Sequence, residues 1–183
     1  MNATTTRVPN ARYGTASIAL HWLMLIVIVA VYACIDLHEY FPKGSDLRVG
    51  LKNWHFMLGL TVLLLVALRV VLRLTSETPP IVPPPPRWQV VLARLVQAGL
   101  YVLMIGMPIL GWLTLSASGK PIPFFFGQLP GLVNESKSVA GWAKEIHETC
   151  GNIGYYLIGL HAAAALFHHY FVRDNTLRRM LPG

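Results

Sequence analysis

Four long apolar stretches dominate the chain, and polar segments separate them. They cover residues 16–35, 54–72, 90–115 and 146–172. Each is long enough to cross a lipid bilayer as one helix, which takes about 20 residues. The pattern therefore predicts an all-α integral membrane protein, a bundle of four transmembrane helices, with residues 1–183 forming a single domain.

The polar segments are rich in residues that end helices. Residues 36–53 contain three acids and a proline, residues 75–87 contain the proline run 83–86, and residues 116–145 contain several glycines and prolines. A proline run cannot continue a helix and forms a stiff, extended segment. We expect these three segments to be the loops between the helices, with 116–145 the longest.

The composition excludes a soluble enzyme and a disordered chain. Hydrophobic residues make up 54% of the sequence and charged residues 13%, with a mean hydropathy of +0.51, whereas a soluble domain has about 25% charged residues. The net charge of +7 would indicate nucleic-acid binding in a soluble protein. Here the cations flank the apolar stretches, so nucleic acid is not expected as a partner.

The cations gather on one side of the predicted bundle. The two chain termini, segment 75–87 and the adjoining helix ends carry nine arginines and two acids, whereas the other two loops carry six cations and six acids. The nine arginines are Arg7, Arg12, Arg69, Arg73, Arg87, Arg94, Arg173, Arg178 and Arg179. Because cytoplasmic loops are enriched in Lys and Arg, both termini are expected in the cytoplasm.

Six of the seven histidines lie in or at the ends of the apolar stretches, and only His38 falls in a loop, where we expect no special role for it. An ionisable residue inside a membrane is costly and is by default a functional candidate. His55 and His147 fall near the outer ends of their helices, and His21 and His161 near the inner ends. His147 and His161 are 14 residues apart, which is about 21 Å and close to four full turns, so they share one helix face. The spacing predicts two facing pairs at two depths, His55 with His147 and His21 with His161.

Two facing imidazoles at one depth favour haem over a bare metal ion. Haem iron takes its axial ligands from side chains, whereas zinc would need four ligands at one depth. We therefore expect two haem groups, with iron ligated by the four paired histidines. Gly151 and Gly154 share the face of His147 and His161 and would leave room for a flat cofactor; close helix packing is the alternative explanation for them.

Several stretches carry a family resemblance. They are Ala19-Leu-His-Trp, Trp54-His55 with Gly59, His147-Glu-Thr, the stretch Leu160-His-Ala-Ala-Ala-Ala-Leu-Phe-His-His-Tyr and Asp174-Asn-Thr-Leu. In these the chain resembles the bacterial cytochrome b561 family, small four-helix proteins of the inner membrane, and the similarity covers nearly its whole length. The resemblance implies two haem b groups on His21, His55, His147 and His161, and a multi-pass protein surrounded by lipid in the bacterial inner membrane.

The resemblance also implies an activity. One branch of the family is similar to superoxide oxidases, which take electrons from superoxide at the periplasmic face and reduce ubiquinone. Haem with two histidine ligands has no open iron position, so electron transfer without a catalytic side chain is expected. Basic residues in the outer loops would attract the superoxide anion. The candidates are Lys43, Arg48, Lys52, Lys120, Lys137 and Lys144.

The sequence leaves the ubiquinone site open between the two sides. His168, Arg87 and Tyr170 are candidates near the inner histidine pair, and His168 could donate a hydrogen bond or a proton to a reducible ligand. Trp112 and the run Phe124 to Phe126 are candidates near the outer pair. Aromatic residues also gather at membrane interfaces without any ligand, which explains either set equally well.

Two other functions compete with superoxide oxidation. A cytochrome b subunit exchanging electrons with a partner dehydrogenase or hydrogenase would use the same four histidines and would need a docking surface for its partner. A non-haem membrane carrier or assembly factor would use the histidines to relay protons or metal ions. Purified protein without colour would favour that last function.

Overall fold

The structure, a computed structural model, describes residues 12–182; Arg7 lies outside this range. Four helices form the fold: α1 (Thr15–Leu37), α2 (Asp46–Thr75), α3 (Arg87–Ala117) and α4 (Lys137–Phe167). Each is long and apolar enough to cross a membrane, which confirms the predicted all-α four-helix class. Between α3 and α4, strands β1 (Ile122–Phe124) and β2 (Gly127–Leu129) form an antiparallel hairpin. Three single turns complete the chain: η1 (His38–Tyr40), η2 (His168–Val172) and η3 (Arg178–Met180).

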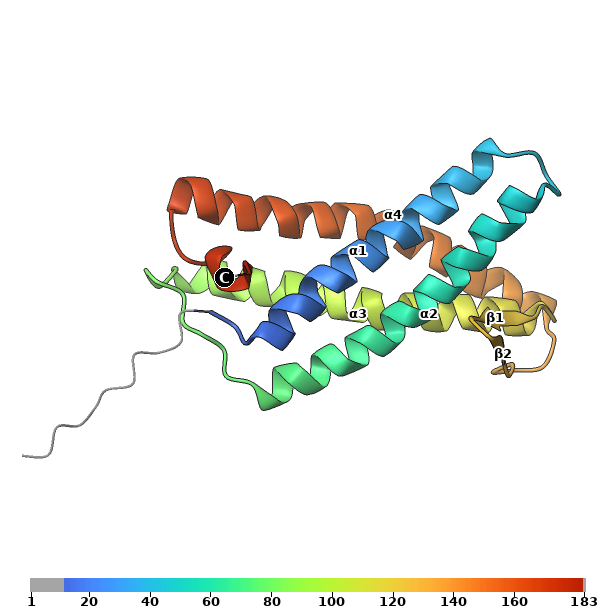
Figure 1. Cartoon of the computed structure of the whole chain (residues 1–183), viewed down its shortest axis with the longest axis horizontal. Coiled ribbons are helices and arrows are strands. Elements are labelled where there is room, and N and C mark those ends of the chain that lie inside the picture. Colours follow the sequence, from blue (N-terminus) through green and yellow to red (C-terminus); the bar gives the residue numbers. More distant parts are fainter. Residues whose placement is uncertain (1–11, 183) are drawn as a thin grey trace, which may run out of the picture.

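The helices pack as two antiparallel pairs. α1 lies along α2 and α3 lies along α4, and the two pairs meet through α2 and α3. One end of the bundle holds the start of α1, the link between α2 and α3, and the C-terminal residues; we call it the termini end (Figure 1). The opposite end holds the β hairpin and the turn between α1 and α2, and we call it the hairpin end (Figure 1).

Two helices begin earlier than the hydropathy pattern predicts. α2 begins at Asp46 instead of residue 54, and α4 begins at Lys137 instead of residue 146. In both cases a serine caps the helix, because Ser45 accepts from the amide of Arg48 and Ser136 accepts from that of Val139, each at 3.4 Å. The first turns are polar, so they lack the apolar signal of a membrane span. The loops predicted over 36–53 and 116–145 are therefore shorter than expected.

His38 is not an ordinary loop residue. It lies in η1, it is buried, and its Nδ1 donates to the carbonyl of Ile35. Arg48 reaches back from α2 and donates to the carbonyl oxygens of His38 at 3.0 Å and Phe41 at 2.8 Å. The turn between α1 and α2 is thus held by side chains, which is why a polar segment contains a buried residue.

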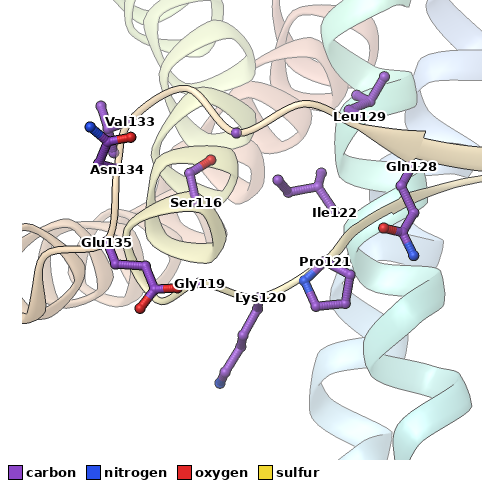
Figure 2. A pocket seen from close by; sticks show the side chains of 11 residues that line it. Ser116, Gly119, Lys120, Pro121, Ile122, Gln128, Leu129, Val133, Asn134 and Glu135 are labelled. Carbon is purple, nitrogen blue, oxygen red and sulfur yellow. The ribbon is translucent and has the colours of Figure 1, made fainter.

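The β hairpin packs on the bundle through apolar and polar contacts. Ile122 lies in a buried cluster with Leu60 and Leu115, and Phe124 packs against it. The indole of Trp112 donates to the carbonyl of Pro130 at 3.0 Å. A shallow hollow of about 480 Å³ lies beneath the loop that leads to α4 (Figure 2). The hydroxyl of Ser116 lines it, yet that hydroxyl already donates to Trp112 and accepts from Leu132.

The C-terminal residues 173–182 fold back across the termini end and fasten its segments together. Asn175 pairs with the backbone of the proline-rich link, accepting from Val82 at 2.8 Å. The buried guanidinium of Arg179 donates to the carbonyl of Pro79, and the indole of Trp22 on α1 donates to the carbonyl of Met180 at 2.7 Å. Residues 76–86 contain no helix, as their prolines predict.

Candidate functional site

The structure brings the four predicted histidines together as two pairs. The imidazole of His55 on α2 faces that of His147 on α4, with ring centroids 6.1 Å apart and planes at 77°. The imidazole of His21 on α1 faces that of His161 on α4, with centroids 6.3 Å apart and planes at 67°. α4 therefore supplies one histidine to each pair, on one face and 14 residues apart.

The spacing of each pair is that of two imidazoles on opposite sides of one metal ion. A metal–nitrogen bond of about 2 Å and a distance of about 1 Å from ring centre to nitrogen put two such centroids about 6 Å apart. Direct stacking or a direct hydrogen bond between the rings would bring them closer. Each pair is thus spaced so that its two imidazoles would hold one metal ion between them.

Backbone carbonyls lie beside the rings of the hairpin-end pair. Nδ1 of His55 lies 3.0 Å from the carbonyl oxygen of Val31; since a carbonyl only accepts, Nδ1 carries the proton and Nε2 keeps its lone pair. A histidine fixed in this way is the usual state of a metal ligand. Nδ1 of His147 is buried, and the backbone of Met107 on α3 lies close enough to accept a hydrogen bond from this imidazole.

A cavity of about 880 Å³ surrounds the hairpin-end pair. Its inner wall is apolar, with Val62, Leu103 and Met104 among the lining residues. Its outer end is charged, and the lining there includes three lysines and three acids. These are Lys52, Lys120, Lys144, Asp36, Glu39 and Glu148. A cavity that is apolar inside and charged outside fits an amphipathic ligand.

Glycines keep backbone close to this cavity. A Cβ on Gly111 of α3 would lie 3.3 Å from Cε1 of His147, so the helix backbone packs directly on that imidazole. Gly59 and Gly151 line the cavity. Gly154 is not part of that lining: a Cβ there would clash with the hydroxyl of Tyr32, so Gly154 lies at the contact between α4 and α1. A role for Gly154 in haem packing stays a prediction.

Comparison with known proteins gives the family. Residues 12–183 match the sequence profile of the family described as prokaryotic cytochrome b561. The chain is 39% identical to "Cytochrome b561 homolog 1" of Escherichia coli (strain K12) over 171 residues, 93% of this chain and 97% of the relative. It is 35% identical to "Probable superoxide oxidase CybB" of Yersinia pestis over 171 residues, 93% and 96% of the two chains. The chain belongs to the prokaryotic cytochrome b561 family.

Membership fixes the general nature of the protein. It is a multi-pass protein of the bacterial inner membrane, it works in electron transfer, and haem b is the cofactor that the family implies. The residues present fit that cofactor. The facing imidazoles of each pair would hold the haem iron, and the cavity at His55 and His147 has an apolar wall and a charged outer end, which would suit an amphipathic cofactor.

Gly111 offers a test of this cytochrome b561 site. We expect Gly111→Ala to weaken haem binding at the hairpin-end pair, because the added methyl group displaces the imidazole of His147 from its packed position. Haem per chain, measured by the pyridine haemochrome assay, should fall measurably below that of the wild type. Gly106→Ala is the matched control, since the same helix leaves open space at Gly106. Equal losses in the two variants would contradict the packing argument.

The six basic candidates for attracting superoxide do not form one group. Lys43 lies in the turn after η1 and Lys137 at the first turn of α4. Lys52, Lys120 and Lys144 line the cavity, and Lys144 also pairs with Glu148 at 3.4 Å. Arg48 is different, because its guanidinium is engaged by backbone carbonyls of the α1–α2 turn.

The three residues predicted for a quinone site near the inner histidine pair do not form one cluster. Nδ1 of His168 lies 2.5 Å from Oδ2 of Asp174, whose side chain is fully buried. Although burial raises the pKa of Asp174, the hydrogen bonds from His168 and Thr176 lower it below its ordinary value. Tyr170 is exposed and Arg87 begins α3. Within residues 12–182, neither of them forms a hydrogen bond, ion pair or ring contact with His168.

Three features near the pairs were not assigned a role from sequence. Arg69 on α2 lies close enough for its charge to act on both imidazoles of the termini-end pair. The hydroxyl of Tyr155 donates to Asp36 at 2.7 Å, and its ring packs on that of Tyr32 at 4.3 Å, which joins α1 to α4 beside the cavity. The position of Arg69 could have been predicted from the sequence, because it follows His55 by 14 residues on the same helix and therefore shares its face.

Proposed function

We propose that this protein is a dihaem b-type cytochrome that oxidises superoxide at the hairpin end and reduces ubiquinone at the termini end. The observation that carries the proposal is the pair of histidine sites at two depths of one bundle, each with ring centroids about 6 Å apart. One site near each membrane surface gives an electron path from one side to the other. The probable superoxide oxidase among the relatives supports the choice of donor.

His55 and His147 would hold one haem, and His21 and His161 the other. Haem bound in this way would supply one-electron chemistry. The protein's own contribution at the hairpin-end site is to fix the imidazole tautomer through Val31 and to exclude water with an apolar inner wall. Gly111 keeps α3 against the ring of His147.

The overall reaction balances with two superoxide anions for each quinone. Each superoxide gives up one electron and leaves as molecular oxygen, and ubiquinone takes two electrons and two protons to become ubiquinol. Superoxide is a small anion, so exposed cations at the hairpin end favour its approach. Lys43 and Lys137 are exposed there, outside the cavity. With the termini in the cytoplasm, as the arginine distribution predicts, the hairpin end faces the periplasm.

The termini end is favoured for ubiquinone because it has a group suited to proton transfer. A buried carboxylate fixes Nδ1 of His168 as the protonated nitrogen and leaves its other nitrogen able to exchange a proton with a ligand. The rings of Phe167 and Phe171 stack beside it, 5.4 Å apart, and both are exposed. At the hairpin end, Trp112 and Phe124 are used to hold the β hairpin.

The test is an optical titration of the purified protein with superoxide. Superoxide should reduce the haem, seen as sharp α-band absorption of a low-spin b-type cytochrome, and added ubiquinone should reoxidise it. Superoxide dismutase added first should prevent the reduction. A low-spin b-type spectrum that superoxide leaves unchanged would reject superoxide as the donor and favour a partner protein as the source of electrons. Colourless protein would reject the cytochrome itself.

A further inference from the structure

Two lysines stand in equivalent positions above the two histidines of the hairpin-end site. Lys52 precedes His55 on α2 by three residues, and Lys144 precedes His147 on α4 by three residues. Three residues are close to one helical turn, or about 4.5 Å toward the hairpin end. All four residues line the same cavity. The lysines therefore flank its outer end from opposite helices, just as the histidines flank its centre.

The surroundings leave these lysines available to an anion. The described residues give Lys52 no ion-pair partner, and the pairing of Lys144 with Glu148 is an exposed contact within one helix, with both side chains more than 60% exposed. Such surface pairs contribute little. The third lysine of the lining, Lys120, lies in the loop after α3, so it has no histidine one turn further along a helix as Lys52 and Lys144 do. Its side chain points away from the neighbouring loop residues (Figure 2).

The polarity of the cavity sets the direction in which a haem would lie. Haem b has an apolar macrocycle and two propionate carboxylates on one edge. The inner wall, with Val62, Leu103 and Met104, offers the carboxylates no cation. The outer end also carries three acids, but it is the only part of the described lining with lysines, and Lys52 and Lys144 flank it from the two helices that carry the histidines. Carboxylates buried without a cation are costly, and a lysine ammonium forms strong charge-assisted hydrogen bonds with them.

We propose that Lys52 and Lys144 bind the two propionates of the haem held between His55 and His147, and so fix the propionate edge toward the hairpin end. The inference rests on the proposed dihaem function and adds to it the residues that orient one cofactor. It also separates the lysines among the six basic candidates into two groups. Lys52 and Lys144 are neutralised by the cofactor, whereas Lys43, Lys120 and Lys137 stay free to attract superoxide. Arg48 belongs to neither group, because backbone carbonyls of the α1–α2 turn engage it.

The experiment measures haem release from the holoprotein to excess apomyoglobin in detergent. The double variant Lys52→Met, Lys144→Met keeps the apolar stems and loses both charges. We expect the hairpin-end haem, identified as the release phase that His147→Ala lacks, to leave about tenfold faster or more, with the other phase unchanged. Arginine at both positions should restore slow release, since it also binds carboxylates. Lys137→Met is the control outside the cavity and should release haem as the wild type does.

A second readout reports on the propionates themselves. In the infrared difference spectrum between oxidised and reduced protein, the carboxylate bands should shift in the double variant and stay in place in Lys137→Met. The single variants serve if the double variant does not fold. Unchanged release and unchanged bands, or equal acceleration in Lys137→Met, would overturn the inference while leaving the dihaem proposal intact. Wild-type protein that binds no haem would instead reject the proposed function.

Discussion

Replacing His147 with alanine is expected to lower the haem content from two groups per chain to one, with the hairpin-end haem lost. His161→Ala is also expected to leave one haem per chain, because the termini-end haem is lost. Each variant removes one axial ligand, and the partner, His55 or His21, cannot hold a low-spin haem alone. The pyridine haemochrome assay measures the amount, and redox potentiometry shows which of the two components has gone.

The two variants should differ from each other although their haem contents agree. Each must keep the redox component that the other loses, since the pairs lie on one face of α4 about 21 Å apart. His169→Gln is a suitable control, because His169 belongs to neither pair and should leave both components in place. Loss of both haems in either variant, with the protein still folded, would contradict two independent sites.

The second large effect concerns electron delivery to ubiquinone. In His161→Ala, superoxide should still reduce the remaining haem at close to the wild-type rate, yet ubiquinone reduction should fall by about a hundredfold or more. The reason is that ubiquinone is proposed to accept electrons at the termini end, beside His168 and Asp174. In His147→Ala, the reduction of haem by superoxide should itself be lost. Stopped-flow absorbance follows the haem, and absorbance of ubiquinol follows the product.

A matched variant separates the side of the quinone site from general damage. Asp174→Asn keeps both histidine pairs and removes the carboxylate that fixes Nδ1 of His168. It should slow haem reoxidation by ubiquinone while leaving haem reduction by superoxide unchanged. Full ubiquinone reduction in His161→Ala would contradict the proposal and move the quinone site to the hairpin end, near Trp112.

Hydropathy and helical periodicity predicted the four helices and the helix face on which the histidines lie. The apolar stretches gave the four spans, and the 14-residue spacing of His147 and His161 placed both on one face, as the facing rings show. The starts of α2 and α4 were missed because Asp46 and Lys137 begin polar turns beyond the apolar run. Hydropathy marks the part of a helix that meets lipid rather than the whole helix.

Contacts between distant segments could not be predicted in this way. Gly111 packs on His147 across two helices, and nothing in the sequence of α3 distinguishes it from Gly106. Asp174 meets His168 because η2 is a π-helical turn and Arg173 then adopts a left-handed conformation with φ of 59°, which reverses the chain. No sequence pattern predicts the π-helical turn or the left-handed conformation of Arg173. Arginine seldom adopts a positive φ.

The central claim is that two facing histidine pairs hold two haem b groups in one chain. The most direct measurement is the ratio of haem b to protein in the purified wild type, combined with low-temperature electron paramagnetic resonance of the oxidised form. The account predicts two haems per chain and two low-spin signals typical of bis-histidine ligation, with no high-spin component. One haem per chain, or a high-spin signal from the intact protein, would contradict it.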